Sequence, residues 1–259
     1  MTDPDAAHLS LVGLGVGPRG ISLAGLEAAR NAQHVFLEGY TALAGDTLEE
    51  LEALLDNEVQ PVGRAVVEGQ TRLLEAARDG GCCLLVVGDP LSATTHTALE
   101  IEAKEQGIPV TVRFGASILT AAAGILGLSH YKFGRTTTLV TPRGAYFPES
   151  PYEVVRDNLA MGLHTLVLLD IREDGTCMTG PEGAQLLLDL EVKREEGVLD
   201  EGTLGAIVAR AGFDDQQAWS GSLTDLSGLD CGAPMHTIVV PGEMSEFEAD
   251  ALERLTHGP

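Results

Sequence analysis

Short apolar runs alternate with stretches of helical periodicity along the first half of the chain. The runs at His8–Leu14, His34–Glu38, Cys83–Val87 and Val110–Arg113 predict strands. The run Cys83–Val87 is apolar enough to be buried on both faces of a parallel sheet. Between the strands, leucine and alanine recur at helical spacing, as after the capping box Thr47-Leu-Glu-Glu50. This alternation indicates a parallel α/β sheet.

A second α/β pattern fills the rest of the chain. The patterns predict strands at Thr136–Val140, Leu163–Leu169, Leu204–Arg210 and His236–Val240, and helices at Ser117–Gly127, Tyr152–Met161, Gln185–Arg194 and after the capping box Ser245-Glu-Phe-Glu248. The loop Phe213–Pro234 is weakly periodic and predicts no element. We therefore expect two α/β domains, 1–116 and 117–259, with a cleft between them.

The loop Gly88-Asp-Pro-Leu-Ser-Ala-Thr-Thr-His96 carries candidate chemistry. Proline donates no ladder hydrogen bond, so Gly-Asp-Pro ends the preceding strand, and Thr94 and Thr95 are expected to cap the next helix. In open α/β sheets, ligands bind at the carboxyl ends of strands. Asp89, Ser92 and His96 are therefore candidate site residues, although a capped turn without a ligand fits the same composition.

A second glycine pattern, Gly15-Val-Gly-Pro-Arg-Gly20, follows the first strand, and Glu38 lies where a ribose-binding acid would stand. On spacing alone this predicts an NAD(P)-binding oxidoreductase. Pro18 counts against that alternative, because phosphate-cradling loops present backbone N–H groups to the pyrophosphate. The simpler interpretation is a tight turn whose glycines allow close packing.

The charge balance is strongly acidic. The chain has 16 Lys and Arg against 39 Asp and Glu, a net charge of −23. Without a basic patch we expect no direct nucleic-acid binding. Few lysines and a diffuse acidic surface resemble proteins of high-salt cytoplasm, so we interpret the charge as the mark of a halophilic archaeon.

Composition also limits location and cofactor class. No run of about 18 apolar residues is present, so we expect no membrane span. The acidic start Met1–Asp5 does not have the pattern of a secretory signal, which predicts a cytoplasmic protein. The four cysteines show no metal-ligand spacing, and we expect neither a disulfide nor a metal site.

Seven strings in consistent order resemble the diphthine synthases, a family of tetrapyrrole-methylase-like methyltransferases. They are Val12-Gly-Leu-Gly15, Gly88-Asp-Pro-Leu91, Ala93-Thr-Thr-His96, Tyr131-Lys-Phe-Gly134, His164-Thr-Leu-Val-Leu-Leu-Asp-Ile171, Ala209-Arg-Ala-Gly212, and the segment from Pro234-Met-His236 through Val240-Pro-Gly242. The resemblance implies two α/β domains with S-adenosylmethionine in the cleft between them. It also implies a homodimer that methylates, up to the trimethylated form, the amino group of the modified histidine of elongation factor 2 in diphthamide biosynthesis.

Position by position, the resemblance implies a set of cofactor contacts. They are Val16, Asp89, Ser92, Ser117, Ile118, Leu169, Ala211 and His236. Val16 departs from the family's usual leucine, and the turn after it is shorter than the family's charged loop.

Methyl transfer requires a neutral amine, and the candidate bases are Asp89, His96 and Asp170. Lys132 is expected to be structural or to serve in docking. The alternatives are a tetrapyrrole or corrinoid methyltransferase, the oxidoreductase, and a non-catalytic partner of the translation factor.

Overall fold

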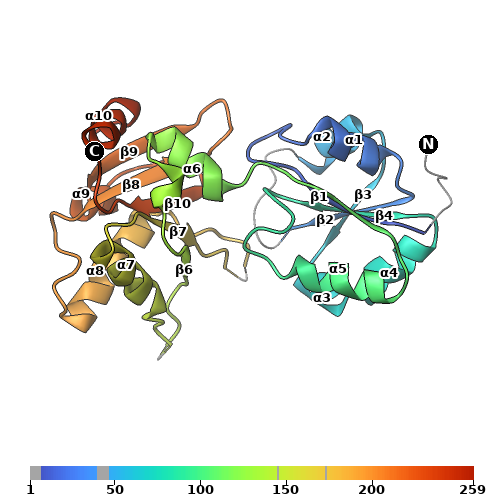
Figure 1. The fold of residues 1–259 in the computed structure, drawn as a ribbon, viewed down its shortest axis with the longest axis horizontal. Coiled ribbons are helices and arrows are strands. Elements are labelled where there is room, and N and C mark those ends of the chain that lie inside the picture. Colours follow the sequence, from blue (N-terminus) through green and yellow to red (C-terminus); the bar gives the residue numbers. More distant parts are fainter. Residues whose placement is uncertain (1–6, 40–46, 145, 173) are drawn as a thin grey trace. The chain divides into compact units, whose positions relative to one another are not determined.

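The computed structural model describes residues 7–39, 47–144, 146–172 and 174–259. The segment Met1–Asp5, which does not have the pattern of a secretory signal, lies outside the described residues. The chain divides into two compact units, Met1–Ile118 and Leu119–Pro259 (Figure 1). The boundary expected from the sequence lay two residues earlier.

The first unit is built on a parallel five-stranded sheet with the order β3-β2-β4-β1-β5. Its strands are β1 (Leu9–Gly13), β2 (His34–Glu38), β3 (Val59–Val62), β4 (Cys82–Val86) and β5 (Val110–Arg113). β1 and β4 lie at the centre and are buried along their whole length. This is the doubly covered parallel sheet that the apolar runs predict.

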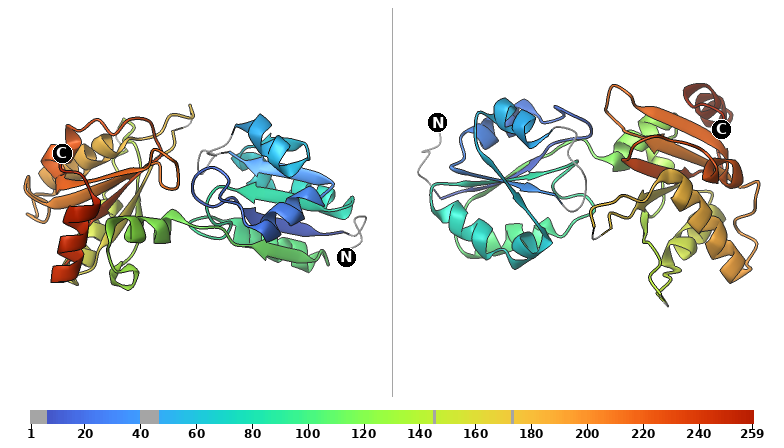
Figure 2. Two further views of the ribbon diagram at one scale, coloured as in Figure 1. Left: turned by 90° about the horizontal axis from the view of Figure 1, so that it is seen from above. Right: turned by 180° about the vertical axis from the view of Figure 1, so that it is seen from behind.

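Helices cover both faces of this sheet (Figure 2). They are α1 (Leu23–Arg30), α2 (Leu48–Leu55), α3 (Arg64–Gly69), α4 (Thr71–Arg78) and α5 (His96–Glu105). Val12 and Leu85 pack with α1 and α2 on one face, whereas the neighbouring Leu11 and Leu84 pack with α3, α4 and α5 on the other. Side chains alternate between the faces of a strand, so each strand joins two hydrophobic cores.

The second unit contains a mixed sheet with the order β6-β7-β10-β8-β9. Its strands are β6 (Thr137–Leu139), β7 (Thr165–Leu169), β8 (Leu204–Ala209), β9 (Gln217–Ser222) and β10 (His236–Val240), and its helices are α6 (Ile118–Leu126), α7 (Ser150–Ala160), α8 (Gly180–Arg194), α9 (Leu223–Ser227) and α10 (Glu246–Leu255), with a 3₁₀ turn at His130–Lys132. β6 and β7 are parallel, and the other pairs are antiparallel. One core joins α7, α8 and α9 to this sheet.

Most predicted elements are confirmed, and His34–Glu38, Val110–Arg113 and His236–Val240 have the predicted bounds. The sequence did not predict β3, a four-residue edge strand that contains Pro61, and proline is tolerated mainly at sheet edges. Nor did it predict β9 and α9, which lie within the stretch from 213 to 234.

The expected cap at Thr94 and Thr95 is wrong. α5 begins at His96, and Thr95 holds the N-cap position without a side-chain cap hydrogen bond. An N-cap side chain normally works from an extended backbone, whereas Thr95 has φ −101° and ψ 8°. The predicted capping boxes at Thr47 and Ser245 are both present.

Within the described part of the chain, no helix combines the length and apolar character needed to cross a membrane. All four cysteines are free thiols. The described His, Cys, Asp and Glu side chains form no group of three or more that could hold a metal ion.

Candidate active site

Three loops meet at the carboxyl edge of the first sheet, after β1, β4 and β5. The Gly15 and Gly88 backbones exchange two hydrogen bonds of 3.0 and 2.9 Å. A Cβ on Gly13 would lie 2.6 Å from the Gly88 carbonyl oxygen, and a Cβ on Gly115 would collide with the same atom. The loops therefore touch through bare backbone, which brings the segments carrying Val16, Asp89 and Ser117 to one edge.

The loop after β4 folds around the Asp89 carboxylate. Asp89 Oδ1 accepts hydrogen bonds from the Leu91 N–H (3.0 Å) and from the Ser92 hydroxyl (2.9 Å). This Asx-type turn joins two of the predicted cofactor residues, Asp89 and Ser92, and fixes the direction of the carboxylate.

His96 lies below this loop and is fully buried. Its Nδ1–H donates to the Pro90 carbonyl oxygen at 2.8 Å, and its Nε2 lies 2.7 Å from Glu38 Oε2. The side chains of both His96 and Glu38 are 0% exposed. Burial alone lowers the pKa of His96, but the hydrogen bonds to Glu38 and Pro90 outweigh it and leave the pKa raised.

This geometry corrects two expectations. Glu38 faces His96 inside the protein and so is not placed to bind a ribose. Both ring nitrogens of His96 contact protein groups, and its buried side chain cannot reach an external amine. Asp89 and Asp170 are therefore the remaining candidate bases. That assignment remains a prediction.

The predicted residues of the second unit gather at one edge of its sheet. Leu169 ends β7, Ala211 lies two residues beyond the end of β8, and His236 begins the antiparallel β10 beside Ala209. Asp170 follows Leu169, and its Oδ2 accepts from the Thr141 N–H at 3.0 Å. Ser117 and Ile118 lie at the start of α6. Of the eight predicted cofactor residues, all but His236 are half-buried, so a ligand can reach them.

His236 is held as a neutral ring. Its Nδ1 accepts from the Gly180 N–H at 3.0 Å, and its Nε2–H donates to the Ala233 carbonyl oxygen at 2.9 Å. Burial, helped by the nearby Arg210, lowers the pKa of His236. The ring thereby ties the first turn of α8 to the start of β10.

Lys132, from the Tyr131-Lys-Phe-Gly134 string, contacts α10 instead of a ligand edge. Its Nζ lies 2.7 Å from Glu248 Oε2, and that carboxylate also accepts from the Ser129 and Ser245 N–H groups. His164 Nε2–H donates to Glu248 Oε1 at 3.3 Å. The structural role expected for Lys132 is consistent with these contacts.

Sequence reasoning missed two features that shape these edges. One is the backbone contact at Gly13 and Gly115; its signal is a glycine at the end of β1 and another two residues after β5. The other is Arg210, which is 8% exposed, pairs with Asp215 at 2.6 Å and donates to the Cys231 carbonyl oxygen at 2.9 Å. Arg210 holds the loop next to Ala211, and the string Ala209-Arg-Ala-Gly212 was its sequence signal.

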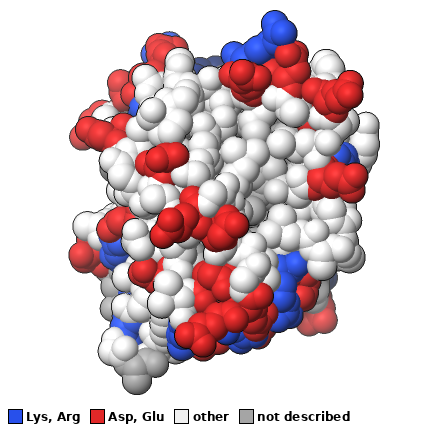
Figure 3. All heavy atoms as spheres, turned by 90° about the vertical axis from the view of Figure 1, so that its left-hand side faces the viewer, with Lys and Arg blue, Asp and Glu red and all other residues white. Residues whose placement is uncertain are grey.

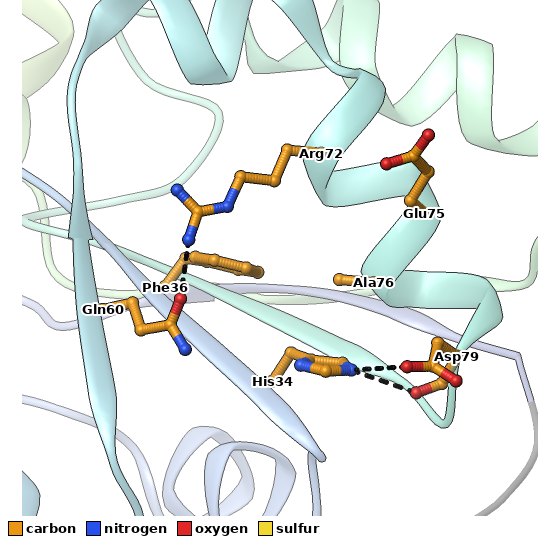
Figure 4. Close-up of a pocket in the computed structure, with 7 residues that line it drawn as sticks. All are labelled: His34, Phe36, Gln60, Arg72, Glu75, Ala76 and Asp79. Carbon is orange, nitrogen blue, oxygen red and sulfur yellow. Dashed lines mark hydrogen bonds and ion pairs between the residues drawn. The ribbon is translucent and has the colours of Figure 1, made fainter.

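A separate pocket of about 290 Å³ lies between β2, β3 and α4 (Figure 4). Arg72 lies over the Phe36 ring at 5.1 Å and donates to Gln60 at 2.7 Å, while His34 contacts Asp79. All of the predicted site residues are described, and none of them lines this pocket.

Comparison with known proteins agrees with this arrangement. A profile of the family described as Tetrapyrrole (Corrin/Porphyrin) Methylases matches residues 8–227. The diphthine synthase of Methanocaldococcus jannaschii is 43% identical over 95% of this chain and 98% of its own length, and that of Methanococcus maripaludis is 41% identical over the same shares. A crystal structure of a diphthine synthase superposes with a TM-score of 0.88 at 31% identity and covers 97% of this chain and 96% of its own.

The chain belongs to the diphthine synthase family. It is therefore a methyltransferase of the diphthamide pathway with the tetrapyrrole methylase fold. Membership excludes the oxidoreductase alternative, and the burial of Glu38 supplies the structural reason. The turn from Gly15 to Gly20 is closed by tight backbone packing, because a Cβ on Gly15 would lie 2.6 Å from the Gly20 carbonyl oxygen.

Proposed function

We propose that this chain uses S-adenosylmethionine to methylate the amino group of the modified histidine of elongation factor 2, up to the trimethylated amine. The observation that carries the proposal is the gathering of the predicted cofactor residues at strand ends within each unit. Relatives named diphthine synthase over nearly the full chain support the same acceptor.

The residues present fit this cofactor. Asp89 supplies a carboxylate for hydroxyl or amino donors, Ser92 and Ser117 supply hydroxyl groups, and Ile118 and Leu169 supply apolar surface. The backbone contact among the loops after β1, β4 and β5 places their peptide groups close together without side chains between them. We propose that Val16, Ala211 and His236 complete the contacts.

When bound, S-adenosylmethionine supplies a methyl group activated by a sulfonium. The protein's part is to align the acceptor nitrogen for in-line attack, and orientation of this kind provides a large share of the rate. The attacking amine must be neutral. Asp89 or Asp170 would take its proton, or burial of the amine would lower its pKa enough to release the proton unaided.

The test has two steps. Calorimetric titration of the whole chain in molar salt should show binding of S-adenosylmethionine and none of NAD. Incubation with unmethylated elongation factor 2 should then raise the mass of the factor by whole methyl groups. If a corrinoid or porphyrinoid, the substrates that the family description names, becomes methylated and the factor does not, the proposed acceptor is wrong.

We also propose that the protein acts as a homodimer in a high-salt cytoplasm. Figure 3 shows one face on which Asp and Glu outnumber Lys and Arg, with acidic groups along the margins and the lower part. The net charge is −23. Screening of such a surface stabilises the fold. We expect the melting temperature to rise with salt and light scattering to give twice the mass of the chain.

A further inference from the structure

Asp89 is flanked by two residues that are each held to the sheet. On one side, Gly88 exchanges two backbone hydrogen bonds with Gly15, two residues beyond the end of β1. On the other side, the Pro90 carbonyl oxygen accepts the Nδ1–H of His96 at 2.8 Å. The position of the carboxylate therefore depends on both anchors.

The second anchor ends on β2. His96 Nε2 lies 2.7 Å from Glu38 Oε2, and Glu38 is the last residue of β2, which pairs with β4 at Leu37 and Leu85. The strand cannot shift without breaking its pairing. The chain of contacts thus runs from the sheet through Glu38 and His96 to the loop.

Proton positions make this anchor stiff. A carbonyl oxygen only accepts hydrogen bonds, so Nδ1 of His96 carries a proton in every state that keeps the Pro90 bond. Nε2 lies 2.7 Å from a carboxylate oxygen, so the ring is also protonated there and the two side chains form an ion pair. Both side chains are 0% exposed, so separating them would leave a buried polar group without a partner at a cost of several kcal/mol.

We propose that Glu38 and His96 are positioning residues for methyl transfer, because their pair fixes Pro90 and thereby the direction from which Asp89 meets the cofactor. The inference rests on the proposed use of S-adenosylmethionine. It assigns a role to Glu38, which the family resemblance leaves unexplained, and it gives His96 a role other than catalytic base.

Three substitutions at Glu38 test the proposal. Glu38→Leu removes the partner of His96 and should weaken S-adenosylmethionine binding about tenfold, the effect of one lost charge-assisted hydrogen bond. Glu38→Asp keeps the charge but withdraws it by one methylene, and should weaken binding about threefold if half of that bond energy is lost. Glu38→Gln should bind within about twofold of wild type, because its amide can donate to Nε2 while Nδ1–H remains on Pro90.

The matched control is Glu248→Leu, which breaks a second buried histidine–glutamate contact, that of His164 in the second unit. It should lower the melting temperature without changing the dissociation constant for S-adenosylmethionine, measured by calorimetry below both melting temperatures. Hydrogen exchange at Leu91 and Ser92 should become faster in Glu38→Leu and stay unchanged in the control. Should Glu38→Leu not fold, Glu38→Asp and the exchange rates decide the question.

The outcomes separate the two proposals. Wild-type protein that does not bind S-adenosylmethionine overturns the proposed function, whereas loop exchange in the Glu38 variants still reports on the anchor. The positioning role is overturned if Glu38→Leu binds like wild type with unchanged loop exchange. It is also overturned if Glu38→Gln loses as much affinity as Glu38→Leu, or if Glu248→Leu weakens binding equally.

Discussion

Each unit buries a histidine against a glutamate, and the two pairs hold their protons differently. The Glu38–His96 contact measures 2.7 Å and the Glu248–His164 contact 3.3 Å. Burial does not distinguish the pairs, since no side chain of the four is more than 1% exposed. The difference therefore comes from the neighbours of each pair.

The second ring nitrogen decides the protonation state. In His96, Nδ1 faces the Pro90 carbonyl oxygen, an acceptor, so it must carry a proton. In His164, Nδ1 accepts from the Gly242 N–H, so only Nε2 carries one. Burial lowers the pKa of His164, and Lys132 adds to the effect against the opposing pull of Glu248.

The buried Glu248 carboxylate accepts several hydrogen bonds. Desolvation alone would raise the pKa of Glu248, but the Lys132 ammonium and the Ser245 and Ser129 N–H groups hold it well below its ordinary value. A buried histidine–glutamate pair is thus not one motif. One pair is an ion pair that holds a loop, and the other is a charged carboxylate that accepts hydrogen bonds from Lys132, His164 and backbone N–H groups.

The largest expected effect is a difference between the two pairs in the free energy of unfolding. Glu248→Leu should cost about 4 kcal/mol in the free energy of unfolding, because it leaves Lys132, His164 and backbone donors without their acceptor. Glu38→Leu should cost about 3 kcal/mol. Urea denaturation of both variants checks the order, and a larger loss at Glu38 would contradict it.

Amide substitutions sharpen the contrast. Glu248→Gln should cost about 2 kcal/mol, because either orientation of the amide sets its NH₂ against donors. Glu38→Gln should cost less than about 1 kcal/mol, because His96 can turn neutral and accept from the amide. Equal losses in urea denaturation would show that the two pairs hold protons alike.

Removing Lys132 tests the contribution of the partly exposed partner of Glu248. Lys132→Met should cost about 1 kcal/mol, the typical loss for a partly exposed charged hydrogen bond. It should raise the pKa of His164, because the cation that disfavours imidazolium is gone. Histidine NMR titration should show this rise together with an unchanged His96.

The smallest expected effect is a change in how protein stability depends on pH. The pKa of His96 is raised above its ordinary 6.5, so its contribution is complete below pH 6.5 and is lost as the pH rises through the folded-state pKa. The pKa of Glu248 is lowered from 4.5, so its contribution is present above pH 4.5 and is lost as the pH falls further. Melting curves of wild type, Glu38→Gln and Glu248→Gln across pH should show these opposite losses.

Local patterns predicted what depends on neighbours in sequence. Apolar runs identified the central strands, and Ser-x-x-Glu and Thr-x-x-Glu spacing identified helix starts. β3 escaped because four residues with a proline carry no strand period. The mixed direction of the second sheet was not predicted either, since alternation does not report strand polarity.

The sequence predicted the parts of the candidate site whose residues lie close together along the chain. Asp89 and Ser92 belong to one turn, so the sequence could bring them together. Glu38 and His96 meet because β2 pairs with β4, a register between strands distant in sequence that no local pattern contains. Glu38 stands at the end of β2, where a ribose-binding acid would be expected. The same position places it beside His96.

The bare backbone contact of Gly13, Gly88 and Gly115 bears on how this edge can evolve. A side chain gained at Gly13 or Gly115 would displace a neighbouring loop. Single substitutions at these two positions are therefore expected to be selected against. Variation at this edge must therefore enter at positions other than these glycines. A directed-evolution library for altered acceptors should keep the glycines and the predicted cofactor contacts fixed and randomise the residues around them.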